Sequence, residues 1–266
     1  MKYILPNFYD SFIYNKLLKE DFFTTVNIEG IQGTYPFCIF NGGCNNIEYE
    51  EIALYIDLIN GLGQYGILGN KILLDFGNIN LEEKDYVNTF GNLIVETFYT
   101  NSCFYFLVSQ ENFIEYLINK YPNIQFILHQ NYINFHTEQE IQKIVTKYYN
   151  NIKYIITTDL NECRNIKNVK KIYLLSFFNC QQCKHYETCV NYDNNQTLGY
   201  SKSSILNTCE VKKFIDINTL LDKINYVKNS NIDIIMFETI PIFHEEICYN
   251  IIKDIFEREI TQNDLF

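Results

Sequence analysis

Short runs of β-branched and aromatic residues recur along the chain, and most are followed by a segment of helix length with an amphipathic pattern. The runs are mostly continuous rather than alternating, which is typical of strands that are buried on both faces. Runs of this kind cover residues 36–40, 71–76, 103–109, 124–129, 153–157, 172–177, 211–215 and 232–237. The pattern therefore predicts eight parallel strands.

The segments between these runs carry apolar residues at helical spacing, most clearly over residues 48–61 and 112–121. Another helix is expected after Thr137, a good N-cap residue, because Glu140 stands three positions later and completes a capping box. Strict alternation of strands and helices implies parallel pairing with right-handed crossovers. Eight such units favour an α/β fold of the TIM-type (β/α)8 barrel class, and an open doubly wound sheet is the alternative.

Residues 1–30 do not follow this repeat. Their apolar residues, among them Phe8, Phe12 and Leu17, predict one amphipathic helix that plugs the lower end of the barrel. The rest of the chain shows no linker, and its 266 residues suit a barrel of about 250 residues. We therefore expect a single domain over residues 1–266, with residues 1–30 as a short N-terminal helical extension.

Composition and charge narrow the class of protein. Hydrophobic residues make up 47% of the chain, which excludes global disorder. The net charge of −11 argues against nucleic acid as a main partner, and the basic stretch over residues 164–171 is interpreted as a solvated helix end. The sequence contains neither an apolar run of about 18 residues nor a signal-peptide pattern, so we expect a cytoplasmic protein without a membrane partner.

Polar residues stand at nearly every predicted strand end, and in a parallel barrel these ends share the rim where active sites form. Asp75, His129 and Glu238 each end or directly follow an apolar run, which makes them candidate catalytic residues for proton transfer or substrate orientation. Candidate substrate-binding residues on the same rim are Asn41, Gly42, Gly43, Asn78 and Asn131. The alternative is structural: Asp and Asn often cap the next helix, and His129 would be a hydrogen-bonded core residue.

The strongest chemical signal is a cluster of four cysteines over residues 180–209, Cys180, Cys183, Cys189 and Cys209. Four cysteines can hold either tetrahedral zinc or an iron–sulfur cluster. Structural zinc usually shows two C-x-x-C pairs, whereas only one is present here, so the spacing favours a cluster, with 4Fe–4S expected and zinc as the alternative. The chain has nine cysteines, and the scattered ones are expected to be small buried hydrophobes.

Three features together resemble the collagenase-like peptidase superfamily, in particular a bacterial branch. They are the segment over residues 36–43 that ends Asn41-Gly42-Gly43, the pair Gly77-Asn78, and the cysteine loop with His185-Tyr186 inside it. The resemblance implies an iron–sulfur barrel, and some members of that superfamily carry out oxygen-independent hydroxylation of quinone precursors or RNA bases. The cysteine gaps of this chain are shorter than the usual pattern of the family, so a shared substrate does not follow.

Three functions remain open at this point. The leading hypothesis is an iron–sulfur barrel enzyme with redox or hydroxylation-type chemistry on a small molecule or a modified polymer unit, served by a redox partner protein. The second is a hydrolase or lyase with structural zinc, in which the rim residues carry out acid–base chemistry. The third is a non-catalytic accessory protein, which predicts a barrel mouth blocked by side chains.

Overall fold

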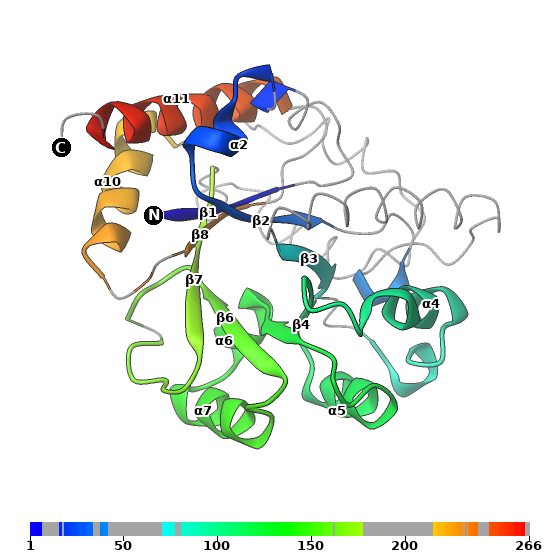
Figure 1. Cartoon of the computed structure of the whole chain (residues 1–266). Helices are drawn as coiled ribbons and strands as arrows, with labels where there is room; N and C mark the ends of the chain where they lie inside the picture. Colours follow the sequence, from blue (N-terminus) through cyan, green and yellow to red (C-terminus); the bar gives the residue numbers. More distant parts are fainter. Residues whose placement is uncertain are drawn as a thin grey trace, which may run out of the picture.

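The computed structural model describes residues 1–6, 16–17, 19–33, 38–41, 71–77, 81–161, 163–177, 215–230, 232, 234–238 and 245–263. These residues form a closed barrel of eight parallel strands, in which each strand pairs with the next in sequence and β1 pairs with β8 (Figure 1). The prediction of a TIM-type (β/α)8 barrel is therefore confirmed. The strands are β1 (Lys2–Leu5), β2 (Ile28–Gly33), β3 (Lys71–Phe76), β4 (Phe104–Val108), β5 (Phe126–Leu128), β6 (Ile152–Thr157), β7 (Lys170–Leu175) and β8 (Ile234–Phe237).

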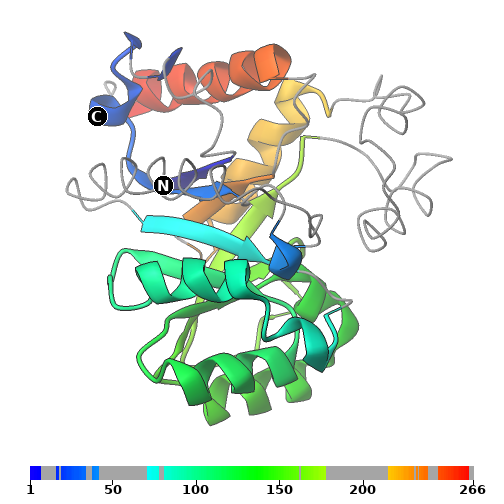
Figure 2. The same cartoon turned by 90° about the vertical axis from the view of Figure 1, so that its right-hand side faces the viewer.

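Helices surround the strands. The outer helices α4 (Thr89–Phe98), α5 (Glu111–Lys120), α7 (Glu138–Lys147), α10 (Ile217–Lys228) and α11 (Glu245–Asn263) lie around the barrel in Figure 1. Figure 2 shows α11 (red) and the pair α4 and α5 (blue-green to green) on opposite sides of the strands. Shorter elements are α2 (Phe22–Thr25), α6 (Gln130–Phe135) and the 3₁₀ turns η1 (Ile39–Asn41) and η3 (Glu83–Asp85). The predicted capping box at Thr137 and Glu140 is present at the start of α7.

The prediction that residues 1–30 stay outside the repeat is wrong, because β1 and β2 come from this part of the chain. β1 is only four residues long, and β2 includes two glycines, a glutamate and a glutamine, so neither has the β-branched and aromatic density of the later strands. Phe8 and Phe12, on which the predicted plug depends, lie outside the described residues, and Leu17 is buried in the cluster outside the barrel wall. Phe22 of α2 packs on Phe256 of α11, with 5.5 Å between the ring centres.

Two predicted strands are also wrong. The end of the segment over residues 36–40 belongs to the 3₁₀ turn η1, so Asn41 does not close a strand. Residues 211–214 lie outside the described residues, Ile215 is not in a strand, and β7 pairs directly with β8, which leaves no barrel position for a strand between them. A short apolar run alone does not distinguish a strand from a tightly packed turn.

The core has two parts, one on each side of the barrel wall. Inside the barrel, alternate residues of seven strands form an apolar cluster, Ile4, Leu73, Tyr105, Leu107, Ile127, Tyr154, Ile156, Ile172, Leu174, Ile234 and Met236. The residues between them point outward and pack beneath the helices in a larger cluster. Tyr3 of β1 stacks on Phe237 of β8 with 5.6 Å between ring centres, and this contact seals the barrel where its first and last strands meet.

The amino-terminal end of the barrel carries a charged network. Glu29 of β2 accepts hydrogen bonds from Lys71 of β3 and, at 2.8 Å, from Lys2 of β1. Burial raises the pKa of Glu29, but the two lysines outweigh it, so that the pKa lies below its usual value. The network ties three neighbouring strands together at the end opposite to the candidate site. No helix in the described part of the chain combines the length and apolar character that a membrane span needs.

Candidate functional site

Where five strands end, the inner face changes from apolar to a polar residue that is buried or half-buried, whereas the corresponding residue after β6, Thr158, is exposed. The last inward apolar residues of the five strands are Leu73, Leu107, Ile127, Leu174 and Met236. Side chains alternate along a strand, so the next inward positions lie two residues further on. These positions are Asp75, Ser109, His129, Ser176 and Glu238. We call them the mouth ring, because parallel strands all end at the same, carboxyl-terminal mouth of the barrel.

Asp75 is held with its two oxygens in different roles. Oδ1 accepts a hydrogen bond from the backbone N–H of Gly77 at 2.8 Å, which fixes the rotation of the carboxylate. Oδ2 faces Nε2 of His129 at 3.9 Å, and both side chains are partly accessible, with exposed fractions of 16% and 13%. A separation of 3.9 Å is longer than a direct hydrogen bond, so Oδ2 stays available as an acceptor for another group.

His129 is the N-cap residue of α6, and its Nδ1 accepts a hydrogen bond from the N–H of Asn131 at 3.1 Å. A backbone N–H can only donate, so Nδ1 carries no proton and this bond assigns the hydrogen of the neutral ring to Nε2. Burial lowers the pKa of His129 below its usual value, and the Asp75 carboxylate opposes this shift only in part. His129 is therefore a neutral imidazole at neutral pH, with its Nε2–H directed to the side of Asp75.

The loops after β3 and β5 are fastened to one another beside this pair. The Asn131 side chain donates from Nδ2 to the carbonyl of Gly77 at 3.4 Å. A Cβ atom on residue 77 would lie 2.8 Å from Asp75 Oδ1 and 3.1 Å from the His129 ring, so only glycine leaves room for both side chains. Asn131, expected to bind substrate, contributes here as a brace that holds Asp75 and His129 in place.

Glu238 lies in the other part of the mouth ring. Its carboxylate accepts a hydrogen bond from the hydroxyl of Ser176, which directly follows the neighbouring strand β7, and its backbone N–H donates to the carbonyl of Leu175 at 3.0 Å. Burial, with the Glu238 charge as a second cause, raises the pKa of the Cys248 thiol to about 12, so that thiol stays protonated. The structure thus brings Asp75 and His129 together and pairs Glu238 with Ser176, a partner that the sequence pattern did not single out.

Several predicted residues lie beyond what the structure describes. Gly42, Gly43 and Asn78 are outside the described residues. Asn41 is the last residue of η1, and the ring of Phe40 in the same turn contacts the ring of Phe76, with 5.2 Å between the ring centres. This contact places the backbone of η1 against the carboxyl-terminal end of β3. The part of the prediction that concerns substrate contacts of these four residues stays a prediction.

The four candidate metal ligands, Cys180, Cys183, Cys189 and Cys209, also lie outside the described residues. Within the described ranges, no group of three or more His, Cys, Asp or Glu side chains is arranged to hold a metal ion. Among the described cysteines, Cys38, Cys163 and Cys248 are buried and Cys103 is partly exposed. This confirms for three of them the prediction that the scattered cysteines act as small hydrophobic side chains.

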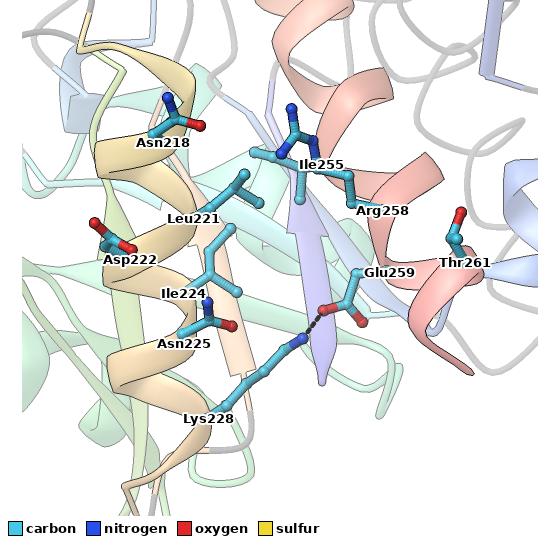
Figure 3. Close-up of a pocket in the computed structure, with 10 residues that line it drawn as sticks. All are labelled: Asn218, Leu221, Asp222, Ile224, Asn225, Lys228, Ile255, Arg258, Glu259 and Thr261. Atoms are coloured by element: carbon cyan, nitrogen blue, oxygen red, sulfur yellow. Dashed lines mark ion pairs between the residues drawn. The ribbon is translucent and has the colours of Figure 1, made fainter. Parts of the chain in front are cut away.

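A separate groove of about 430 Å³ lies between α10 and α11 (Figure 3). Lys228 of α10 and Glu259 of α11 form an ion pair across it, and Asp222 and Arg258 add one charge of each sign. All of its lining residues belong to these two helices, so the groove is on the helical layer and includes no residue of the mouth ring. Its balanced charges favour neither an anionic nor a cationic ligand.

No protein-family model matches the sequence, and no curated protein matches it. The resemblance to the collagenase-like peptidase superfamily therefore stays a prediction from the motifs. The mouth ring itself is the basis for assigning chemistry: a fixed carboxylate acceptor and a neutral imidazole donor face one another at 3.9 Å.

Proposed function

We propose that this chain is a barrel enzyme that binds a small molecule or a modified polymer unit at the mouth ring. Asp75 Oδ2 would accept a proton from the bound substrate, and the Nε2–H of His129 would donate a hydrogen bond to the substrate oxygen on which negative charge develops. The observation that carries the proposal is the Asp75–His129 pair, with its 3.9 Å separation and its assigned hydrogen positions.

The neutral state of His129 decides the division of roles. A general base needs a free lone pair directed at the substrate, but the only lone pair of neutral His129, on Nδ1, is used by the N–H of Asn131. Asp75 keeps Oδ2 available because Gly77 binds the other oxygen. Asp75 is thus the proton acceptor in this proposal, and His129 is the hydrogen-bond donor.

The proposal includes a 4Fe–4S cluster held by Cys180, Cys183, Cys189 and Cys209, because four thiolates are the usual ligand set of such clusters. The described part of β7 and its extension ends at Phe177, three residues before Cys180 and just after Ser176 of the mouth ring. This supports a cysteine segment that starts from the same end of the barrel as the Asp75–His129 pair. When bound, a cluster would supply electron transfer, for which a redox partner protein is needed.

The second candidate is a hydrolase or lyase with structural zinc in place of the cluster. The Asp75–His129 pair favours it, since proton transfer by these two groups needs no electron donor. Metal content separates the two candidates. The cluster predicts brown, anaerobically purified protein in which iron and sulfide exceed zinc, whereas structural zinc predicts colourless protein with about one zinc per chain.

Matched variants make the metal test specific. Cys180→Ser should lose most of the bound metal, and Cys103→Ser, at a partly exposed cysteine outside the cluster of four, should keep it. Equal metal content in both variants, or a chain purified without metal under anaerobic conditions, would contradict a site built from the four cysteines. Asp75→Asn tests the other half of the proposal: turnover should be lost while the melting temperature stays nearly unchanged. A lower melting temperature with full turnover would make Asp75 a structural residue.

A further inference from the structure

Ser109 carries a buried hydroxyl without a hydrogen-bond partner in the described part of the chain. Its exposed fraction is 6%, and its Oγ makes no hydrogen bond. Buried hydroxyl groups nearly always have a partner, because removing one from water without replacing its hydrogen bonds is unfavourable. An unpaired hydroxyl at this depth therefore points to a ligand atom that completes it.

The position of Ser109 says where that ligand atom lies. In the barrel register Asp75 of β3 pairs with Leu107 of β4, and Val108 pairs with Leu128 of β5. The N–H of His129 donates to the carbonyl of Val108 at 2.9 Å. Ser109, the next residue after Val108, therefore lies between the ends of β3 and β5, the strands that lead to Asp75 and His129. Because Tyr105 and Leu107 point into the barrel, the alternation directs Ser109 inward as well.

Each group of the pair can act on a different atom of one ligand. The Nε2–H of His129 can donate to a carbonyl oxygen, and Asp75 Oδ2, 3.9 Å from Nε2, can accept a proton from the carbon beside that carbonyl. Ser109 directly follows β4, the strand between β3 and β5, so its inward hydroxyl is placed to bind a second oxygen on the neighbouring carbon.

We propose, on the basis of the proposed function above, that the mouth ring recognises a neutral small molecule with oxygens on adjacent carbons, an α-hydroxycarbonyl compound. Ser109 binds the hydroxyl oxygen and the Nε2–H of His129 binds the carbonyl oxygen, so that Asp75 Oδ2 is the group that faces the C–H bond between them. The charges of the ring favour a neutral ligand over a phosphorylated one. Its ionisable members are the carboxylates of Asp75 and Glu238 and the neutral His129, and none of the five residues is cationic.

An α-hydroxycarbonyl compound also gives Asp75 a proton to remove. The C–H bond next to the carbonyl breaks, its electron pair forms the double bond of the enolate, and the carbonyl electrons move to the oxygen that His129 Nε2–H binds. The proton goes to Asp75 Oδ2. In deuterated water that proton exchanges, and a deuteron returns to the same carbon, so no other reactant is consumed.

The test uses the full chain and hydroxyacetone as the probe, with ligand-observed NMR for binding and loss of its C–H signal in deuterated water for proton transfer. Wild type should bind and exchange. Ser109→Ala should weaken binding about tenfold, as expected for one lost hydrogen bond worth about 1.4 kcal/mol. Ser102→Ala, at an exposed serine that precedes the same strand, should behave like wild type. Hydroxyacetone phosphate should bind more weakly than hydroxyacetone.

The outcomes separate this inference from the proposed function. If Ser109→Ala binds hydroxyacetone as tightly as wild type while Asp75→Asn abolishes exchange, the role of Ser109 is wrong and the proton acceptor stands. If binding depends on Ser109 but exchange continues in Asp75→Asn, the ligand class stands and Asp75 is not the proton acceptor. Absence of hydroxyacetone binding to wild type, or tighter binding of the phosphate, would overturn the ligand class itself.

Discussion

Replacing Gly91 by Ala should destabilise the protein, although alanine favours helices. Gly91 is in the first turn of α4, and a Cβ atom there would lie 2.3 Å from Cε2 of Phe40 and 2.6 Å from two further atoms of that ring. Normal carbon contacts are about 3.5–4.0 Å, so the ring has to move by more than about 1 Å. Phe40 is fully buried against Phe76 and Phe113, at 5.2 and 4.7 Å between ring centres, so the displacement spreads into the core.

Two opposing terms set the magnitude of the effect. Alanine gains at most about 1 kcal/mol over glycine inside a helix. Overpacking of a full core costs about 1–3 kcal/mol, and a contact as short as 2.3 Å belongs at the upper end. The N-cap bond from the Gly91 N–H to Asn88 at 2.9 Å is unaffected, because alanine keeps that donor. We therefore expect Gly91→Ala to lower the free energy of unfolding by about 2 kcal/mol.

Urea unfolding followed by circular dichroism measures this change, with an unchanged m-value as evidence that the same transition is compared. The double variant Gly91→Ala with Phe40→Leu provides the control. Leucine removes the ring atoms that clash, so the double variant should lose less stability than the sum of the two single variants. If Gly91→Ala raises the stability by about 1 kcal/mol, helix propensity dominates and the close packing of Phe40 on α4 is refuted.

Three further changes probe the mouth ring and the opposite end of the barrel. Gly77→Ala should lower turnover about tenfold or more with a small effect on stability, because the new methyl group pushes Asp75 away from His129. An unchanged rate in a steady-state assay would contradict the geometry of the pair. The pKa of His129 is lowered in the folded state, so its neutral form contributes stability that is complete above the unfolded-state pKa of about 6.5 and is lost as the pH falls below that value. His129→Gln should therefore flatten the pH dependence of the unfolding free energy below about pH 6.5. Glu29→Gln should cost about 1–3 kcal/mol, because the amide oxygen can still accept but no longer carries the negative charge that the partly buried lysine pair faces. Glu82→Gln, in an exposed ion pair, should change the unfolding free energy by less than about 1 kcal/mol.

The sequence pattern predicts the barrel and six of its strands correctly, because β3 to β8 are dense in β-branched and aromatic residues. It does not identify β1 and β2. The inner face of β2 carries Gly30 and Gln32 instead of apolar residues. A Cβ at Gly30 would lie 2.5 Å from the Lys71 carbonyl oxygen, so close packing against β3 selects glycine, a residue of low strand propensity. The reason for glycine at this position is its contact with β3, which the sequence alone does not show.

The candidate site is predictable to a similar degree. Asp75 and His129 follow from their places at strand ends, but the tautomer of His129 depends on its contact with Asn131, which the sequence does not show. Ser109 stands at a strand end like many loop serines, and its chemical meaning comes from burial without a partner. Residue type and position thus suggest where chemistry occurs, while hydrogen positions and unpaired atoms indicate what it can be.

The pairing of β1 with β8 has a consequence for biosynthesis. Tyr3 pairs with Ile235, so the strand made first has to wait for almost the last part of the described chain before its outer edge is covered. At about 5–20 residues per second, a separation of about 230 residues takes ribosomes roughly 10–50 s. During that time β1 and β2 can form a ribbon with an open edge, which is a site for pairing with other nascent chains. The nascent barrel is therefore expected to depend on chaperones that shield β1 and β2 until β8 has been made.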